Sequence, residues 1–265
     1  MRITKKMPSL SNVSAGSTAT LDVPVGRTID RIAFAYSGIT LLQMKNIKVM
    51  VNGKTIQEYP DGVYLQKLNA YYGLTDTAGF LTLNFVRPEM ANIPQRRLTG
   101  LGTANVDSFQ VSFDVDAAAT APVVSATAIQ SEPSNIGSIM KIKRFPMASS
   151  VSGLLEIDKI VKGNTIRAIH IFDIDAAADT KPTSLEVEMD SVKVFEASAT
   201  LAAEMQKQHG RTPQADIYHC EFTLEGDFGQ ALLTQQAQDF RIRPTLANAG
   251  AIDVVVEYLD GLNGI

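Results

Sequence analysis

The sequence of 265 residues contains a single cysteine, Cys220, and only three histidines. One cysteine excludes an intrachain disulfide and any zinc site built on several cysteines. No stretch approaches 18 consecutive apolar residues, so the sequence predicts no membrane-spanning helix. The basic residues near the start are not followed by an apolar run, so we expect no signal peptide. These absences predict a soluble protein that is made in a reducing cytoplasm.

Basic residues are also fewer than acidic residues. The chain has 24 Lys and Arg residues against 28 Asp and Glu residues, which gives a formal net charge of −4. General nucleic-acid binding requires a basic face, so no specific nucleic-acid partner is expected. Apolar residues make up 45% of the chain, and the length suits two domains that each have a core.

Two stretches of the chain, residues 47–58 and 185–196, follow one pattern. In each, apolar and polar residues alternate up to a turn, which is Asn52-Gly53 in the first stretch and Asp190-Ser191 in the second. Alternation with a period of two predicts a half-buried strand. Asn-Gly between two such strands is a strong signal for a β-hairpin.

The repeat extends over most of the chain. Three further matches occur in the same order and at one constant spacing: Gly26 with Gly163, Gly73 with Gly210, and Phe85 with Phe222. Near the end of each half, Ala104-Asn105 and the strand from Phe109 match Ala247-Asn248 and the strand from Ile252 at a slightly larger spacing. Because solenoid repeats are far shorter, the sequence predicts a tandem duplication of one β-rich domain.

The predicted fold is all-β, a tandem double jelly roll of two eight-stranded β-sandwich or barrel domains, each with a short helix. We place the first jelly roll at residues 1–116 and the second at 138–265. The small and polar residues 117–137 are interpreted as a linker, with room for one strand at 123–129. Two helices are predicted, at 64–72 and at about 198–209, and a third short one near 232–238.

Candidate catalytic residues are few. Tandem jelly rolls are also built by bicupin enzymes, whose metal site needs a His-x-His pair, and none of His170, His209 and His219 forms one. Gly53-Lys54-Thr55 resembles the end of a phosphate-binding loop, but it lies in a predicted hairpin and lacks the preceding glycine. Cys220 lies in a predicted strand without an assignable base. We therefore expect no enzyme activity, no catalytic residue and no cofactor-binding residue.

One acidic run is the best candidate for a metal site. Asp173, Asp175 and Asp179 lie within seven residues, and Ca²⁺ prefers several oxygen ligands from one loop. Asp114 and Asp116 form a weaker candidate. Since the run lacks the glycine turn and the closing glutamate of an EF-hand, solvated loop carboxylates are the alternative interpretation.

Basic residues occur in four groups: Arg2 with Lys5 and Lys6, Lys141 with Lys143 and Arg144, Arg96 with Arg97, and Arg241 with Arg243. Their places correspond between the two copies, which favours basic residues at one end of both domains. Such groups suit acidic neighbours or lipid headgroups. Plain solubilising charge is the alternative.

On the matches that begin at Gly26, Asn52, Gly73 and Phe85, the chain resembles the double jelly-roll major capsid proteins of tailless, membrane-containing icosahedral viruses. The short length is similar to the compact corticovirus-like members. This resemblance implies an upright pair of barrels and a homotrimer of pseudo-hexagonal outline. It also implies a lattice of trimers over an internal lipid membrane, with a separate vertex (penton) protein. Calcium is a plausible stabiliser of such a shell, and the chain would reside in the virion.

The main alternative is a tandem jelly-roll carbohydrate-binding module or adhesin. Such a protein places aromatic side chains on an exposed face. Tyr71 and Tyr72 form the adjacent aromatic pair that this alternative needs, but the predicted helix accounts for them as packing residues.

Overall fold

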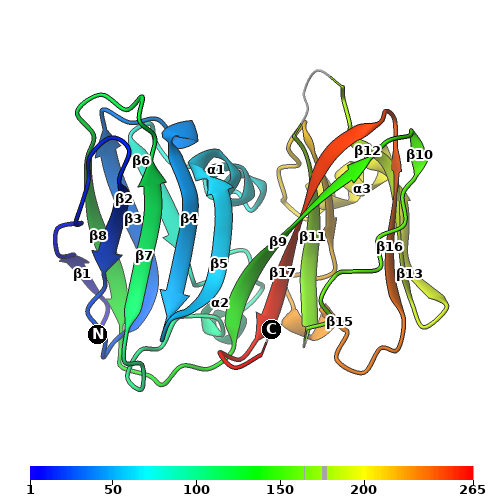
Figure 1. Ribbon diagram of the computed structural model, residues 1–265. Coiled ribbons are helices and arrows are strands. Elements are labelled where there is room, and N and C mark those ends of the chain that lie inside the picture. Colours follow the sequence, from blue (N-terminus) through cyan, green and yellow to red (C-terminus); the bar gives the residue numbers. More distant parts are fainter. Residues whose placement is uncertain (164, 175–177, 265) are drawn as a thin grey trace. The chain divides into compact units, whose positions relative to one another are not determined.

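The computed structural model describes residues 1–163, 165–174 and 178–264. The chain divides into two compact units, Met1–Ile142 and Lys143–Ile265. Figure 1 shows that each unit is built mainly of strands, with a few short helices. Across the described ranges, no helix is both long enough and apolar enough to cross a membrane.

The first unit contains two four-stranded antiparallel sheets, ordered β1-β8-β3-β6 and β2-β7-β4-β5. The strands are β1 (Ile3–Lys6), β2 (Thr18–Asp22), β3 (Thr28–Ser37), β4 (Met44–Val51), β5 (Lys54–Asp61), β6 (Phe80–Asn84), β7 (Phe109–Val115) and β8 (Val123–Ser131). The short helices are η1 (Leu41–Gln43), α1 (Gly62–Tyr71) and α2 (Ile93–Arg97). Strand orders 1-8-3-6 and 2-7-4-5 define a jelly roll.

The second unit repeats this plan. Its sheets are ordered β9-β17-β11-β14 and β10-β16-β12-β13, and a short strand, β15, pairs with β11. The strands are β9 (Ile139–Ser149), β10 (Gly153–Leu154), β11 (Thr165–Asp173), β12 (Pro182–Met189), β13 (Val192–Ser198), β14 (Ile217–Glu221), β15 (Leu232–Leu233), β16 (Phe240–Leu246) and β17 (Gly250–Asp260). The helices are α3 (Ala199–Gln208) and η2 (Phe228–Gln230). The prediction of an all-β double jelly roll is therefore confirmed.

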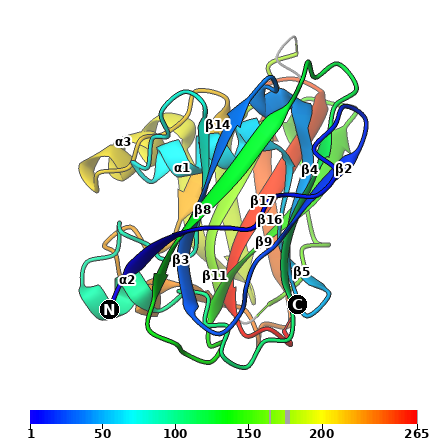
Figure 2. The same ribbon diagram turned by 90° about the vertical axis from the view of Figure 1, so that its left-hand side faces the viewer.

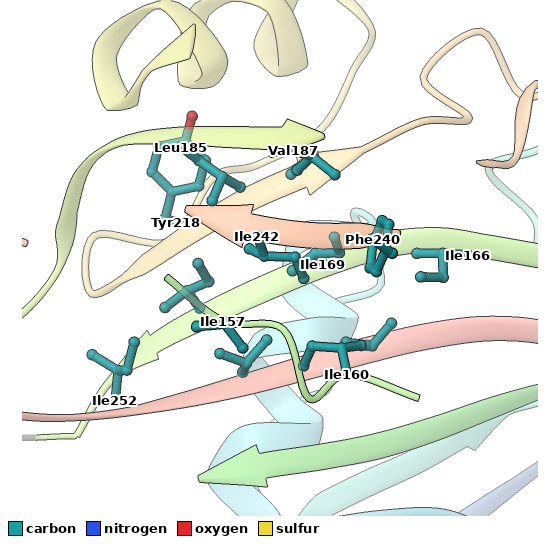
Figure 3. Close-up of a cluster of buried hydrophobic side chains, with 14 of the residues drawn as sticks. Ile157, Ile160, Ile166, Ile169, Leu185, Val187, Tyr218, Phe240, Ile242 and Ile252 are labelled. Carbon is teal, nitrogen blue, oxygen red and sulfur yellow. The ribbon is translucent and has the colours of Figure 1, made fainter. Parts of the chain in front are cut away.

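The core of the second unit lies between its two sheets (Figure 3). Every second residue of β17 from Ile252 to Tyr258 is buried in this cluster, and Ile166 and Ile169 of β11 meet Val187 and Ile242 from the opposite sheet. Each fully buried aliphatic side chain contributes about 1.5–3 kcal/mol. The alternation seen in the sequence thus marks the face of each strand that is buried in the core.

The two hairpins predicted from the repeat have the same geometry. Asn52 and Asp190 have φ of 49°, and Gly53 and Ser191 follow with φ of 73° and 66°. Two successive residues with positive φ make the turn that matches the twist of the flanking strands. Glycine adopts this conformation without cost, whereas a serine is strained there.

The side chains of Asn52 and Asp190 also bind the segment before β7 and before β16, the strands that pair with the first strand of each hairpin. The Oδ1 atom of Asn52 accepts hydrogen bonds from the backbone N–H groups of Asp107 and Ser108, at 2.9 and 3.1 Å. The Oδ1 atom of Asp190 accepts them from Gln238 and Asp239, both at 2.8 Å. The turn before β7 is thus equivalent to the turn before β16.

This equivalence corrects the match made at the end of each half. From the sequence, the strand at Phe109 was paired with the strand at Ile252, but β7 occupies the place in its sheet that β16 occupies in the second unit. The strand of the first unit that is equivalent to β17 is β8. Alternating apolar strands resemble one another, so pattern alone did not distinguish neighbours in the chain.

The same ambiguity affected the domain boundaries. Residues 123–131, within the predicted linker 117–137, form β8, which lies between β1 and β3 in a sheet of the first unit. The predicted first domain, 1–116, therefore lacks a strand that its own sheet requires. The short helix predicted near 232–238 is also absent, because Leu232 and Leu233 form β15 beside β11.

The two main helices begin and end in the same manner. Asp61 caps α1 by accepting two hydrogen bonds from backbone N–H groups of the first turn, and Ser198 caps α3 by accepting one. Gly73 and Gly210 follow the two helices with φ of 74°. Tyr71 and Tyr72 are 0% and 5% exposed, so the helix does account for them as packing residues.

Candidate functional site

The predicted calcium site is only partly covered by the described residues. Asp173 ends β11, and its Oδ1 atom accepts a hydrogen bond of 2.6 Å from the Thr180 hydroxyl. Asp179 has φ of 51°, and Asp175 lies outside the described residues. No group of three or more His, Cys, Asp or Glu side chains arranged to hold a metal ion occurs among residues 1–163, 165–174 and 178–264. Calcium binding by this run stays a prediction.

The weaker acidic candidate is engaged in contacts within its unit. Hydrogen bonds from Thr18 and Asn46, of 2.6 and 2.8 Å, lower the pKa of Asp114. The Lys45 ammonium, 2.5 Å from a carboxylate oxygen of Asp116, lowers the pKa of that group. These contacts already supply the two carboxylates with hydrogen-bond donors.

The structure brings together two histidines that the sequence did not link. His170 of β11 and His219 of β14 are opposite each other in the sheet, and their Nδ1 atoms are 2.7 Å apart. One nitrogen must donate a proton and the other must accept it, so the two rings cannot both be protonated in this geometry. Burial, with a further contribution from His170, lowers the pKa of His219 well below its usual value.

The other residues considered as reactive have structural places. Cys220 is fully buried, and burial raises the pKa of its thiol well above the usual value, which makes it a poor nucleophile. Gly53-Lys54-Thr55 lies at the hairpin between β4 and β5, as predicted, and does not open a helix.

Two charged residues occupy equivalent β-bulges in the two jelly rolls. Asp30 interrupts the pairing of β3 with β8, and Arg167 interrupts the pairing of β11 with β17. Their carbonyl oxygens accept hydrogen bonds from the N–H groups of Phe85 and Phe222, residues that the sequence repeat had matched. Both side chains are fully buried, so one position in the fold carries opposite charges in the two units. The sequence signal for both is a charged residue that directly follows an isoleucine near the start of a strand, Ile29 before Asp30 and Ile166 before Arg167.

In the second unit, Arg167 belongs to a buried network of four charges. Its guanidinium lies 3.3 Å from a carboxylate oxygen of Glu221 and 3.1 Å from one of Glu257. Arg211 completes the network at 2.8 Å from Glu221. Burial opposes the ionisation of Glu221, but the two arginines lower its pKa overall. Two positive and two negative charges balance, which suits a buried structural cluster.

In the first unit, the equivalent carboxylate lies beside a pocket of about 500 Å³. The guanidinium groups of Arg2 and Arg97 each lie 3.4 Å from a carboxylate oxygen of Asp30, and the Ser131 hydroxyl donates a hydrogen bond of 2.9 Å to it. Both arginines also line the pocket. Unlike the partners of Arg167, their side chains are 54% and 45% exposed.

The basic pair Arg241 and Arg243 lies on β16, within a sheet of the second unit. Arg243, on β16, contacts Glu156, Glu186 and Glu188 at 2.6–2.9 Å. Hydrogen bonds with these carboxylates raise the pKa of Arg243. The pair therefore already has acidic partners on its own sheet.

Comparisons with known proteins cover both units. Residues 4–132 match the family model of the viral coat protein P2 N-terminal domain, and residues 139–262 match that of the P2 C-terminal domain. The chain is 30% identical to the major capsid protein P2 of Pseudoalteromonas phage PM2, over 98% of this chain and 97% of that protein.

Solved structures agree with these matches. The crystal structure of the major capsid protein P2 from bacteriophage PM2 superposes with a TM-score of 0.94 at 28% identity, covering 100% of both chains. The major capsid protein of Sulfolobus turreted icosahedral virus gives a TM-score of 0.74 at 14% identity, covering 99% of this chain and 97% of that one, which shows a shared fold. These relatives are structural proteins, and the comparisons give no support to a carbohydrate-binding module or adhesin.

Proposed function

The chain belongs to the family of viral coat protein P2 and is a major capsid protein, and we propose that three copies associate into a homotrimer of pseudo-hexagonal outline. Such trimers would tile an icosahedral shell over an internal lipid membrane. A separate vertex protein would occupy the fivefold positions, where a pseudo-hexagonal unit does not fit. The chain would be made in the host cytoplasm before it enters the virion.

One observation carries the proposal: a single chain contains two jelly rolls with the same strand order. Three copies of a chain with two like units give six like units, which suits a lattice with sixfold neighbours. Closed cyclic symmetry is the common state of soluble oligomers. A stable interface of this kind buries more than about 1,000 Å².

The two jelly rolls still differ, and this difference supports a trimer over a hexamer of single units. Position 30 is acidic and its equivalent 167 is basic, and β15 is found in the second unit. Because the two units of one chain are not identical, a ring of six units from three chains has threefold and not sixfold symmetry.

The test is the native mass of the purified protein by light scattering. A species near three times the chain mass of 28.7 kDa supports the trimer, and a monomer at every concentration contradicts it. The same measurement in a calcium chelator tests the acidic run at Asp173–Asp179. We expect chelation to dissolve assemblies larger than the trimer, and calcium but not magnesium to restore them. Unchanged assemblies would contradict the calcium prediction alone.

A further inference from the structure

The Asp30 carboxylate, which lies beside the pocket, has incomplete hydrogen bonding. The carboxylate is fully buried, yet its Oδ2 atom makes no hydrogen bond to any residue that the structure describes, and the Arg2 guanidinium lies 3.4 Å from it. Arg97 reaches the other oxygen at the same distance. A guanidinium carries five N–H donors, so both arginines keep donors for a second anion. Asp30 thus holds two half-exposed guanidinium groups at the wall of a pocket.

The net charge of the pocket defines the anion that fits. Arg2 and Arg97 contribute two positive charges and Asp30 one negative charge. The amino terminus of Met1 pairs with Glu132, so these two charges cancel. The remaining charge of +1 is matched by a singly charged anion such as a phosphodiester, which arginine binds through paired hydrogen bonds. The volume of about 500 Å³ is within the range of small-ligand pockets.

The rim of the pocket is apolar and exposed. Met1 and Leu98 line it and are 81% and 45% exposed, and Ile93, at the start of α2, is 69% exposed. Figures 1 and 2 both place the N-terminus and α2 at the same end of the first unit. Exposed apolar side chains beside arginines are typical of surfaces that enter the interfacial region of a membrane.

We propose that this pocket binds the phosphodiester headgroup of a membrane lipid, with Arg2 and Arg97 on the phosphate and Met1, Ile93 and Leu98 in the apolar layer beneath it. The inference rests on the part of the proposed function that places the shell over a membrane. Free phosphate could occupy the same arginines but would leave the apolar rim in water. A nucleic-acid backbone would do the same, so the rim favours a lipid.

The experiment measures binding of the purified protein to vesicles of phosphatidylcholine with and without phosphatidylglycerol. Arg97→Gln removes one pocket guanidinium, and we expect binding to the anionic vesicles to weaken at least about fivefold. Arg96→Gln is the matched control, because this neighbour on α2 loses the same charge while its Nε donates to the Met90 carbonyl and does not line the pocket. An equal loss in both variants would mean diffuse attraction and would overturn the proposal.

A second variant keeps the test valid if Arg97→Gln lowers stability by leaving Asp30 with fewer partners. Leu98→Ser leaves the ionic contacts in place, so we expect it to weaken vesicle binding while leaving the affinity for soluble glycerophosphoglycerol unchanged. Competition between vesicles and soluble anions shows whether the bound phosphate comes from a lipid. Full displacement of vesicles by inorganic phosphate, or by duplex DNA with no effect of Leu98→Ser, would overturn the lipid assignment. Light scattering on the same samples separates this result from the proposed function, since a trimer that ignores vesicles contradicts only the headgroup site.

Discussion

At the scale of single residues, small differences between the two copies identify where the fold is under strain. The hairpin turns provide the clearest case, because Gly53 and Ser191 have nearly the same positive φ but different side chains. A non-glycine residue in this region costs about 1–2 kcal/mol, which the rest of the second unit must offset.

Replacing Ser191 by glycine should therefore stabilise the second unit by about 0.5–1 kcal/mol, the relief of strain being reduced by the entropy that glycine adds to the unfolded chain. The thermal unfolding midpoint of the variant measures this gain. Gly53→Ser is the matched control at the equivalent turn and should lower the midpoint. If both exchanges left unfolding unchanged, positive φ would not limit stability at these turns.

His219 predicts how stability depends on pH. Its folded pKa is depressed below the usual 6.5 by burial first and by His170 second, so the folded state favours the neutral ring. The unfolded state then binds the extra proton, and the stabilisation is complete above about pH 6.5 and declines as the pH falls, by at most about 1.4 kcal/mol per pH unit.

Denaturant unfolding between pH 7.5 and pH 5 would measure this slope. His219→Gln should flatten it, whereas His209→Gln, at an exposed position after α3, should keep it. A slope that survives His219→Gln would assign the effect to other groups. Nothing in the spacing of the two histidines in the sequence pointed to their contact, because the pairing of β11 with β14 creates it.

At the scale of elements, the equivalent bulges in β3 and β11 show how burial decides the effect of a charge. Arg167→Met would leave Glu221 and Glu257 buried with one fewer positive partner, and a loss of about 3–5 kcal/mol is expected. Asp30→Asn should cost about 1 kcal/mol or less, because its arginine partners are half-exposed and return to water. Chemical denaturation of both variants provides the comparison, and similar losses would show that the partners' exposure does not control the effect.

The alternation of apolar residues was sufficient to predict the strands that have one buried face, among them β3, β4, β7 and β12. It indicated a strand at 123–129 but assigned it to the linker, because the alanines, serines and threonines of β8 are typical of linkers, and it missed β1 near the start of the chain. Both strands depend on neighbours that are distant in the chain, since β1 pairs with β8 and β8 with β3. Pairing partners of this kind cannot be read from local pattern.

At the scale of the whole molecule, the duplication was predictable because paired features recur in one order along the chain. Turn side chains at Asn52 and Asp190, and glycines at Gly73 and Gly210, each meet a local geometric need that both copies share. The candidate site was not predictable in this manner. Arg2 and Arg97 were recognised as basic residues, but the carboxylate that gathers them, Asp30, is distant from both in the sequence.

The short strands at the sheet edges have a consequence for the life of the protein before assembly. β1 has four residues and carries exposed Lys5 and Lys6, and β10 has only two residues. Short or lysine-bearing edges are poor templates for added strands, so free subunits at high concentration resist polymerising through their backbones. Subunits then associate through contacts between side chains and not through added strands. Such contacts are specific enough to limit the assembly to a closed particle instead of a fibre.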